Sequence, residues 1–459
     1  MRVIVCGAGQ VGSTIARHLA TEGADVTVVD SAPEQARRVD ESYDVRGMVG
    51  HAAHPDVLAR AGAQDADMLI AVTRSDEVNI VACEVAKSLF GVKRRIARLR
   101  HHGYLERAWE GRRVVDELPI DVVISPEVEV ARGIFRRLRT PGAFDMVTLV
   151  DGKVRLLGIH CDQTPCPIEG TPLSDVPRVL PQLPVHVLAI FRRGRAFVPR
   201  GHDRLQAGDD VYVVVGSEGV DELMGAFGHH ERVARRVVIV GAGNVGLHLA
   251  QTLVREAPLV SLKVIEHNKE RAEHVSTVLG DGAVVLNGDA LDKETLEEAN
   301  VRSAETVVAV TNDDETNIFT SVLAKREGCA RAITLVNKTS YEPLLPALGI
   351  DAVVSPNEVT ISTILRHVRR GAISAVHTLR EGFGEVIEAE ALEGSRLVGG
   401  PLAEVVMPEG MRIGALVRPD GTVVIPDGRC RVQPGDRVVA IVTYRALRKA
   451  EAMLTGREA

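Results

Sequence analysis

A glycine-rich motif occurs twice in this chain of 459 residues. The first copy is GAGQVG at residues 7–12, and the second is GAGNVG at residues 241–246. Each copy follows a short apolar run and opens a stretch with helical periodicity. An acidic residue, Asp30 or Glu266, ends the next apolar run. This strand–turn–helix setting, with an acid roughly 20 residues later, is typical of a dinucleotide-binding domain. The sequence therefore predicts two such domains.

Further short segments recur in the same order in both halves, and a duplication explains them better than chance. The matched pairs are residues 50–52 and 288–290, 73–77 and 311–315, Tyr104 and Tyr341, and 120–126 and 350–356. Apolar runs alternate with helical segments in each half, which predicts a parallel sheet covered by helices on both faces. The expected fold class is α/β, with two Rossmann-like, doubly wound parallel-sheet domains.

A smaller unit follows each of these domains. Short alternating strands with Gly/Pro turns predict an α+β domain, and the pairs Gly208-Asp209 and Gly435-Asp436 predict a hairpin turn before its last strand. The expected order is a first Rossmann domain at 1–125, a connecting helix at 126–140, a first small domain at 141–228, a second Rossmann domain at 234–355, a connecting helix at 356–370 and a second small domain at 371–459.

Both connecting segments have the pattern of basic amphipathic helices. We expect their arginines to be solvated or to face an acidic partner. These are Arg132, Arg136, Arg137 and Arg139 in the first, and Arg366, Arg369 and Arg370 in the second.

Composition excludes several classes of protein. A net charge of −7 and an aromatic content of 3% argue against a nucleic-acid-binding protein. No secretory signal is visible, and no apolar run reaches the ~18 residues of a membrane helix. We therefore expect a cytoplasmic protein without direct membrane insertion. Cys161 and Cys166 have no further Cys or His at zinc-site spacing, so no metal site is predicted.

No catalytic set stands out in the sequence. The chain has no P-loop motif, so no machinery for ATP hydrolysis is visible. The histidine pairs at 101–102 and 229–230 lie in polar stretches, which predicts surface positions.

The three glycines of each motif have distinct expected roles. The first permits the tight turn, the second lets the backbone approach a pyrophosphate, and the third allows close packing of helix and strand. Backbone N–H groups at the helix N-terminus would then hold the phosphates. The motif residues predicted to bind a cofactor are Gly7, Gly9, Gln10, Val11, Gly12, Gly241, Gly243, Asn244, Val245 and Gly246. The alternative is a Rossmann fold that has lost its ligand.

Asp30 and Glu266 would accept hydrogen bonds from the ribose diol of the ligand. A carboxylate there repels a 2′-phosphate, which favours NAD(H) over NADP(H). Asp289 could reach the adenine side in the second half, where the first half has His51.

Other candidate residues follow the fourth and fifth strands. Thr73 and Thr311 lie beyond the fourth strand, beside the crevice where such sheets bind ligands. They are predicted to place a hydroxyl near the ligand, or to cap a helix.

The two predicted sites differ after the fifth strand. Arg98 and Arg100 of the first half correspond to Leu335 and Asn337, with Lys338 next. Arginine can bind a phosphate through two donors, whereas lysine acts as a point charge. The first site is therefore expected to bind phosphorylated ligands more tightly. The arginines could instead contact a neighbouring subunit, or be surface residues that flank a buried strand.

The repeated layout resembles the tandem RCK (KTN) architecture of the TrkA family, the cytosolic regulatory subunits of Trk-type bacterial potassium uptake systems. Its marks are the paired glycine motifs, the segment TNDDETN at 311–317, both Ile-Asp…Ser-Pro strands and the Gly-Asp signatures. The resemblance covers nearly the whole chain. It implies a nucleotide sensor that binds NAD(H), with ATP or ADP as further candidates at the same sites.

The resemblance also implies a partner and a location. The partner would be a membrane potassium-translocating subunit of the Trk type, which would hold this protein on the inner face of the cell membrane. Because similar proteins assemble their Rossmann domains into rings, a homotetramer is expected. Two alternatives remain at this point: an NAD-dependent oxidoreductase, for which the small domains offer little room for a substrate site, and a regulator of another transporter or a free-standing nucleotide sensor.

Overall fold

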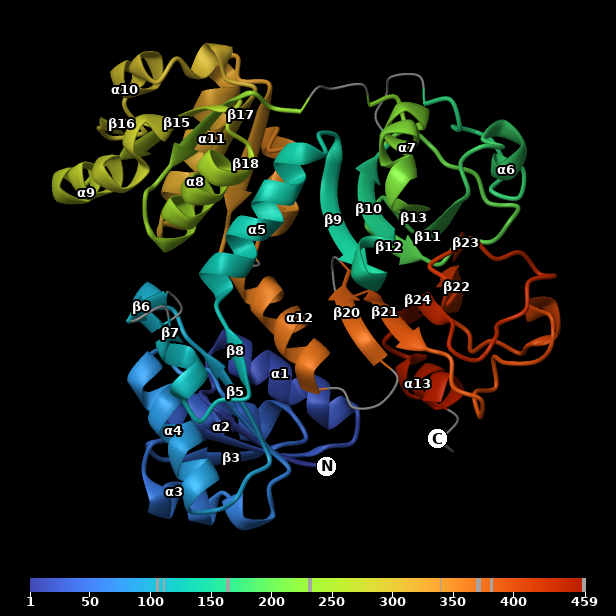
Figure 1. The fold of residues 1–459 in the computed structure, drawn as a ribbon, viewed down its shortest axis with the longest axis horizontal. Helices are drawn as coiled ribbons and strands as arrows, with labels where there is room; N and C mark the ends of the chain where they lie inside the picture. Colours follow the sequence, from blue (N-terminus) through green and yellow to red (C-terminus); the bar gives the residue numbers. More distant parts are fainter. Residues whose placement is uncertain are drawn as a thin grey trace. The chain divides into compact units, whose positions relative to one another are not determined.

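The computed structural model describes residues 1–104, 107–109, 112–161, 166–229, 233–338, 340–368, 373–379 and 383–455. The chain divides into two compact units. The first comprises Met1–Ala131 and Ser355–Val368, and the second comprises Arg132–Val354 and Arg369–Ala459. Each unit contains one parallel sheet (Figure 1).

The first unit contains a six-stranded parallel sheet in the order β3-β2-β1-β4-β5-β8. Its strands are β1 (Arg2–Cys6), β2 (Asp25–Asp30), β3 (Arg46–Val49), β4 (Met68–Ala71), β5 (Arg94–Arg98) and β8 (Val122–Ile124). The helices are α1 (Gln10–Thr21), α2 (Pro33–Ser42), α3 (Pro55–Arg60), α4 (Asp76–Ser88), the beginning of α5 (Pro126–Arg139) and α12 (Pro356–Val368). A short ladder joins β6 (Arg107–Trp109) and β7 (Arg112–Arg113). The reversal of strand order beside β1 is the Rossmann topology.

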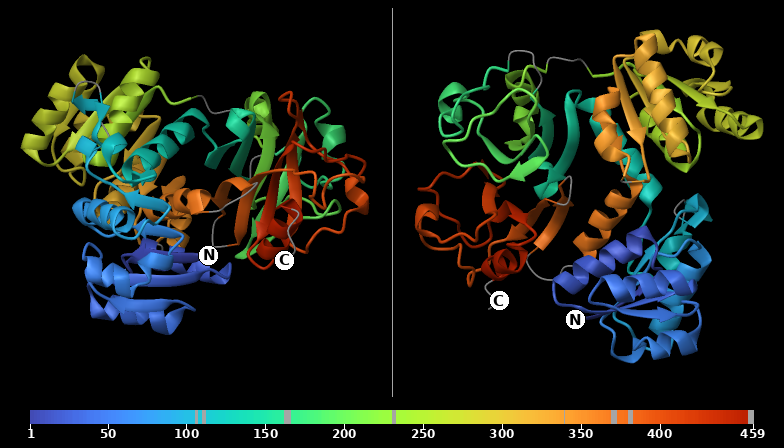
Figure 2. Two further views of the ribbon diagram at one scale, coloured as in Figure 1. Left: turned by 60° about the horizontal axis from the view of Figure 1, so that its bottom comes forward. Right: turned by 180° about the vertical axis from the view of Figure 1, so that it is seen from behind.

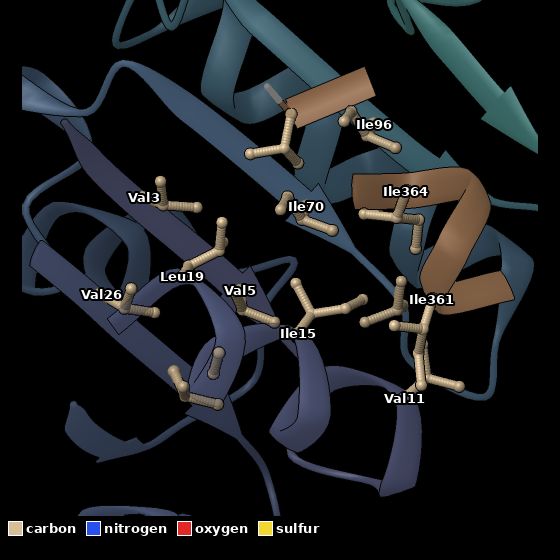
Figure 3. Packing of buried hydrophobic residues seen from close by; sticks show 14 of the residues in the cluster. Val3, Val5, Val11, Ile15, Leu19, Val26, Ile70, Ile96, Ile361 and Ile364 are labelled. Atoms are coloured by element: carbon tan, nitrogen blue, oxygen red, sulfur yellow. The ribbon is translucent and has the colours of Figure 1, made fainter. Parts of the chain in front are cut away.

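The central strands are continuous apolar runs because helices cover both faces of the sheet. Residues 3–6 of β1 and all of β4 are buried. One helix of this unit comes from far along the chain. Helix α12 directly follows the last strand of the second parallel sheet, yet Ile361 and Ile364 lie in one apolar core with Val11 and Ile15 of α1 (Figure 3).

The second unit contains the other parallel sheet, in the order β16-β15-β14-β17-β18-β19. Its strands are β14 (Arg236–Val240), β15 (Ser261–Glu266), β16 (Val284–Asn287), β17 (Thr306–Ala309), β18 (Arg331–Leu335) and β19 (Ala352–Val354). Its helices are α8 (Asn244–Glu256), α9 (Lys269–Leu279), α10 (Lys293–Glu298) and α11 (Asp314–Glu327). The strand order repeats that of the first sheet, as the duplication predicts.

Two antiparallel sheets of five strands complete the second unit, in the orders β12-β11-β13-β10-β9 and β23-β22-β24-β21-β20. The first contains β9 (Ala143–Leu149), β10 (Val154–His160), β11 (Val185–Arg192), β12 (Arg195–Phe197) and β13 (Asp210–Gly216). The second contains β20 (Ile373–Thr378), β21 (Gly384–Glu390), β22 (Met411–Val417), β23 (Val423–Val424) and β24 (Arg437–Thr443). Short helices accompany them: α6 (Val176–Val179), α7 (Val220–Ala226) and α13 (Leu447–Thr455). The predicted fold class is thus confirmed.

The two antiparallel sheets share an apolar core. Phe144 and Tyr212 of the first sheet lie in one buried cluster with Val386 and Ile441 of the second. The sheets lie side by side in each view of Figures 1 and 2.

Each Gly-Asp pair forms the turn before the last strand of its sheet. Gly208 and Gly435 both have a φ of +83°, a left-handed conformation that favours glycine. Asp209 and Asp436 are buried, and each pairs with an arginine of its own small domain, Arg192 and Arg418 respectively. The aspartate therefore stabilises the small domain.

The structure corrects one expectation and sharpens another. His229 is buried, with Nε2 3.0 Å from the carbonyl oxygen of His160, whereas the sequence predicted a surface position. Apolar neighbours in the small domain outweigh the polar local sequence.

Arg137 of the first connecting helix does face an acid, because its Nη2 donates to Asp145 at 3.0 Å. His230, Arg369 and Arg370 lie outside the described residues, as do the side chains of His102 and Arg366.

Candidate functional site

The glycine turn between β1 and α1 forms the floor of the candidate site in the first half. Gly7 has a φ of +106°, and its amide donates to Val29 O at 2.8 Å. A Cβ on Gly12 would lie 1.8 Å from the carbonyl oxygen of Gly7, so only glycine fits there. A Cβ on Gly9 would meet no atom within 4 Å. The second glycine is thus the one that leaves open space above the turn.

The start of α1 is suited to an anionic group. Gly9 is its N-cap and has no side chain that could accept a hydrogen bond from the first turn. Gln10 is exposed, and Val11 is buried against the sheet. The first N–H groups of a helix lack partners within the helix and attract anions.

Asp30, at the end of β2, holds the glycine turn from the neighbouring strand. One carboxylate oxygen accepts from Ala8 N at 2.6 Å, and the other accepts from Ala32 N at 2.8 Å. A carboxylate has about four acceptor positions, so capacity for a ribose hydroxyl remains.

The loop after β4 is fixed by Asn79, a fully buried residue of α4 whose role was not predicted from the sequence. Its Oδ1 accepts from Thr73 N at 2.9 Å and from Thr73 Oγ1 at 2.7 Å. Its Nδ2 donates to Arg98 O at 2.8 Å. The helix N-cap is Ser75 and not Thr73, which excludes the capping role considered for Thr73. We call these hydrogen bonds between the threonine and the asparagine the Thr–Asn lock. The spacing from Thr73 to Asn79 recurs from Thr311 to Asn317, and this repeat could have predicted the lock from the sequence.

Arg98 is the last residue of β5 and is only 6% exposed, which excludes the alternative of a surface arginine. Its Nη2 donates to Thr73 O at 2.8 Å, while its buried Nε has no partner among the described residues. Burial lowers the pKa of Arg98 to about 10, with a smaller contribution from the charge of Arg100. The guanidinium therefore stays charged near neutral pH, and a buried unpaired donor of this kind calls for an anionic partner.

Arg100 is more exposed than Arg98, and its Nε lies 3.8 Å from Oε1 of Glu127 in α5. Glu127 is mostly shielded from solvent, and burial raises the pKa of its carboxyl. The two arginines thus differ, since Arg98 is buried and fixed while Arg100 is solvated and shares its charge with Glu127.

These groups surround one pocket of about 590 Å³. The sequence-predicted residues that line it are Gly7, Gly9, Gln10, Val11, Asp30, Thr73, Arg98 and Arg100. Arg74 and Asn357 also line it, and neither was predicted from the sequence. His51 also lines the pocket, so the lining is rich in cationic and donor groups.

The second half reproduces the backbone of this site. Gly241 has a φ of +94°, and a Cβ on Gly246 would lie 1.9 Å from Gly241 O. Gly243 faces open space, and Asn244 begins α8 with Val245 next. Glu266 is buried and accepts from Ala242 N and Asn268 N, both at 2.8 Å.

The side chains of the second half differ. Thr311 is held by Asn317 in the same way as Thr73 by Asn79, and Asp313 is the helix N-cap. Lys338 donates to Glu315 at 2.8 Å, and this contact raises the pKa of Lys338. Asp289 accepts from Leu291 N at 2.9 Å in the turn after β16. The ammonium group of Lys338, which follows the position matching Arg100, is therefore already paired.

None of the helices in the described residues has the length and apolar character needed to span a membrane. Within the same residues, no group of three or more metal-ligating side chains converges, and Cys161 and Cys166 lie in the apolar core of the first small domain.

Comparisons with known proteins match this architecture. The model of the TrkA-N domain matches residues 3–126 and 237–356, and that of the TrkA-C domain matches residues 163–228 and 386–455. The Trk system potassium uptake protein TrkA of Azorhizobium caulinodans is 46% identical over 453 residues, covering 99% of this chain and 98% of that protein. The TrkA protein of Halomonas elongata is 40% identical over 457 residues, with coverage of 99% and 98%.

Solved structures share the fold at lower identity. The GsuK RCK domain has a TM-score of 0.60 and 21% identity, and the alignment covers 99% of this chain and 95% of that one. The GsuK channel bound to NAD has a TM-score of 0.58 and 20% identity, with coverage of 99% and 79%. At these identities the likeness concerns the fold.

Proposed function

The chain belongs to the TrkA family of Trk potassium uptake systems, and from this premise we propose that the protein is a nucleotide-sensing regulatory subunit that gates a membrane potassium-uptake transporter. The observation that carries the sensing role is the pocket of the first half. A buried arginine with an unpaired donor, the open position above Gly9 and the carboxylate of Asp30 surround one space of about 590 Å³.

NAD(H) is the ligand that this chemistry favours. The N-terminus of α1 and Arg98 suit a pyrophosphate, and Asp30 suits an unphosphorylated ribose. A protein of the same fold is described as a channel bound to NAD, which supports a dinucleotide as the candidate. ATP and ADP share the adenosine and phosphate groups, so they are further candidates at the same sites.

Regulation requires the ligand to bind two arrangements of the domains with different affinity. We propose that ligand binding at the Rossmann domains changes their orientation, and that a Trk-type membrane subunit responds to this change. The protein would assemble as a homotetramer and lie at the inner face of the membrane through that partner.

The alternatives are less favoured. Members of this family are regulatory subunits and not enzymes, which argues against an NAD-dependent oxidoreductase. A regulator of another transporter would share the pocket, and co-purification with a membrane potassium-translocating subunit separates that case from the proposal.

Calorimetric titration of the pure protein with NADH, NAD⁺, ATP and ADP tests the sensing role. The same titrations on Asp30→Ala and Glu266→Ala would rank the two sites. Binding that weakens with either substitution supports the proposal. Absence of binding to the wild-type protein would leave the glycine turns as structural relics.

A further inference from the structure

The pocket of the first half includes a residue from the opposite half of the chain. Asn357 is the second residue of α12, the helix that follows the last strand of the second parallel sheet. It lines the same pocket as Asp30 and Arg98. Its Nδ2 donates to Oε1 of Gln10 at 2.9 Å. Gln10 is the variable residue of the glycine motif and the first residue of α1.

Packing of α12 fixes the position of Asn357. Four apolar residues of α12, at positions 361, 364, 365 and 368, are buried in the core beneath the pocket. Figure 3 shows Ile361, about one turn beyond Asn357 in α12, beside Val11, the second residue of α1. Because the helix is anchored through this core, the side chain at position 357 is held at the rim of the pocket.

The chemistry of the amide suits a bound phosphate. Gln10 and Asn357 place two neutral carboxamides beside the N-terminus of α1, and carboxamide N–H groups donate to anionic oxygens without a charge of their own. The matching residue of the other connecting helix is Glu127, which follows Pro126 as Asn357 follows Pro356. A carboxylate at position 357 would repel a phosphate, so the amide is compatible with an anionic ligand where its counterpart would not be.

We propose that Asn357 contacts the phosphate groups of a nucleotide bound in the first site, which makes this site a composite of both halves of the chain. This inference rests on the proposed function. The ligand would then stabilise the docking of α12 on α1, and docking would strengthen ligand binding by the same factor. Because α12 precedes the second antiparallel sheet in the chain, ligand binding at the first site would affect the second small domain through this helix.

Calorimetric titration of the full-length protein with ADP, combined with hydrogen exchange, tests the proposal. Asn357→Ala should weaken ADP binding by about tenfold, the loss typical of one hydrogen bond to a charged group. Glu358→Ala is the matched control, because the next side chain is exposed and outside the pocket, and its affinity should equal that of the wild type. Saturating ADP should slow exchange of the amides of residues 357–362 in the wild type and in Glu358→Ala, but not in Asn357→Ala.

Hydrogen exchange also separates the two sites, since residues 7–12 and 241–246 report on them individually. If Asn357→Ala bound ADP as tightly as the wild type, and ADP protected its α12 to the same extent, the composite site would be overturned. Nucleotide sensing would remain intact. No ADP binding by the wild type would remove both proposals. If Asn357→Ala does not fold, Asn357→Asp can replace it, because it keeps the size of the side chain and adds a negative charge. Its affinity for ADP should fall by more than tenfold. An ADP affinity equal to that of the wild type would also overturn the inference.

Discussion

The glycines of the motif differ in what surrounds them, and this predicts opposite effects of the same substitution. Gly9→Ala should leave the melting temperature unchanged, since the φ of −66° suits alanine and the new Cβ meets no atom within 4 Å. The methyl group would occupy the space above the turn, so ligand binding should be lost. Gly12→Ala should lower stability by about 1–3 kcal/mol or more, because its Cβ would overlap the carbonyl oxygen of Gly7.

Thermal unfolding and calorimetric titration measure the two effects separately. Gly243→Ala and Gly246→Ala are the matched pair in the second half, where the surroundings of the two glycines are the same. Wild-type affinity in Gly9→Ala would show that no ligand group approaches the turn.

Glu127 predicts a pH dependence of stability. Burial raises the pKa of its carboxyl in the folded protein above the ordinary value of 4.5. The stability that this group contributes is therefore fully present below pH 4.5 and is lost as the pH rises through the raised pKa. Glu127→Gln cannot ionise, so its stability relative to the wild type should increase from about pH 4 to about pH 8. Urea unfolding at both pH values measures this difference. Glu34→Gln on the exposed face of α2 is the control. If the free energy of unfolding of Glu127→Gln changed with pH in parallel with that of the wild type, the prediction would be contradicted.

At the scale of elements, the loop between β4 and α4 depends on one buried amide. Asn79→Ala removes the acceptor for Thr73 N and Thr73 Oγ1 and the donor to Arg98 O. Leaving these groups unpaired should destabilise the first unit by about 1–3 kcal/mol and release the strand end that carries Arg98. Ligand affinity at the first site should fall as well.

Asn317→Ala is the control for this prediction, because it breaks the same lock in the second half. It should lower stability similarly but leave the affinity of the first site unchanged. Hydrogen exchange of residues 73–79 and 311–317 locates each effect. Loss of first-site affinity in Asn317→Ala would show that the loops do not act independently.

Local patterns in the sequence were sufficient for the elements but not for their distant contacts. The glycine motifs and alternating runs predicted both parallel sheets, the family and the turn at Gly208, because these depend on nearby residues. They did not predict that α12 packs against α1, since an amphipathic helix specifies an apolar face and not the surface that covers it. They also missed the burial of His229 and the role of Asn79, because burial of a polar residue is decided by the tertiary partners that satisfy it.

At the scale of the whole molecule, a duplicated backbone carries two different sets of charges. The turn, the acid after the second strand and the Thr–Asn lock recur in both halves. The arginines at two positions of the first crevice do not recur, because Leu335 replaces Arg98 and Asn312 replaces Arg74. Both halves thus keep the same backbone arrangement at the site, while different side chains change the charge of the ligand that each half favours.

This divergence predicts that the first site binds phosphorylated ligands more tightly than the second. Glu266→Ala should retain most of the ADP affinity of the wild type, whereas Asp30→Ala should leave only weak binding. Adenosine, which lacks phosphate, should discriminate less between the two variants. Lys338 is one cation near the second site, but its ammonium group is bound to Glu315. Glu315→Gln should weaken that contact and raise the affinity of the second site for ADP in the Asp30→Ala background. Equal ADP affinities in Asp30→Ala and Glu266→Ala would refute the division, since the arginines of the first pocket would then contribute nothing to phosphate binding.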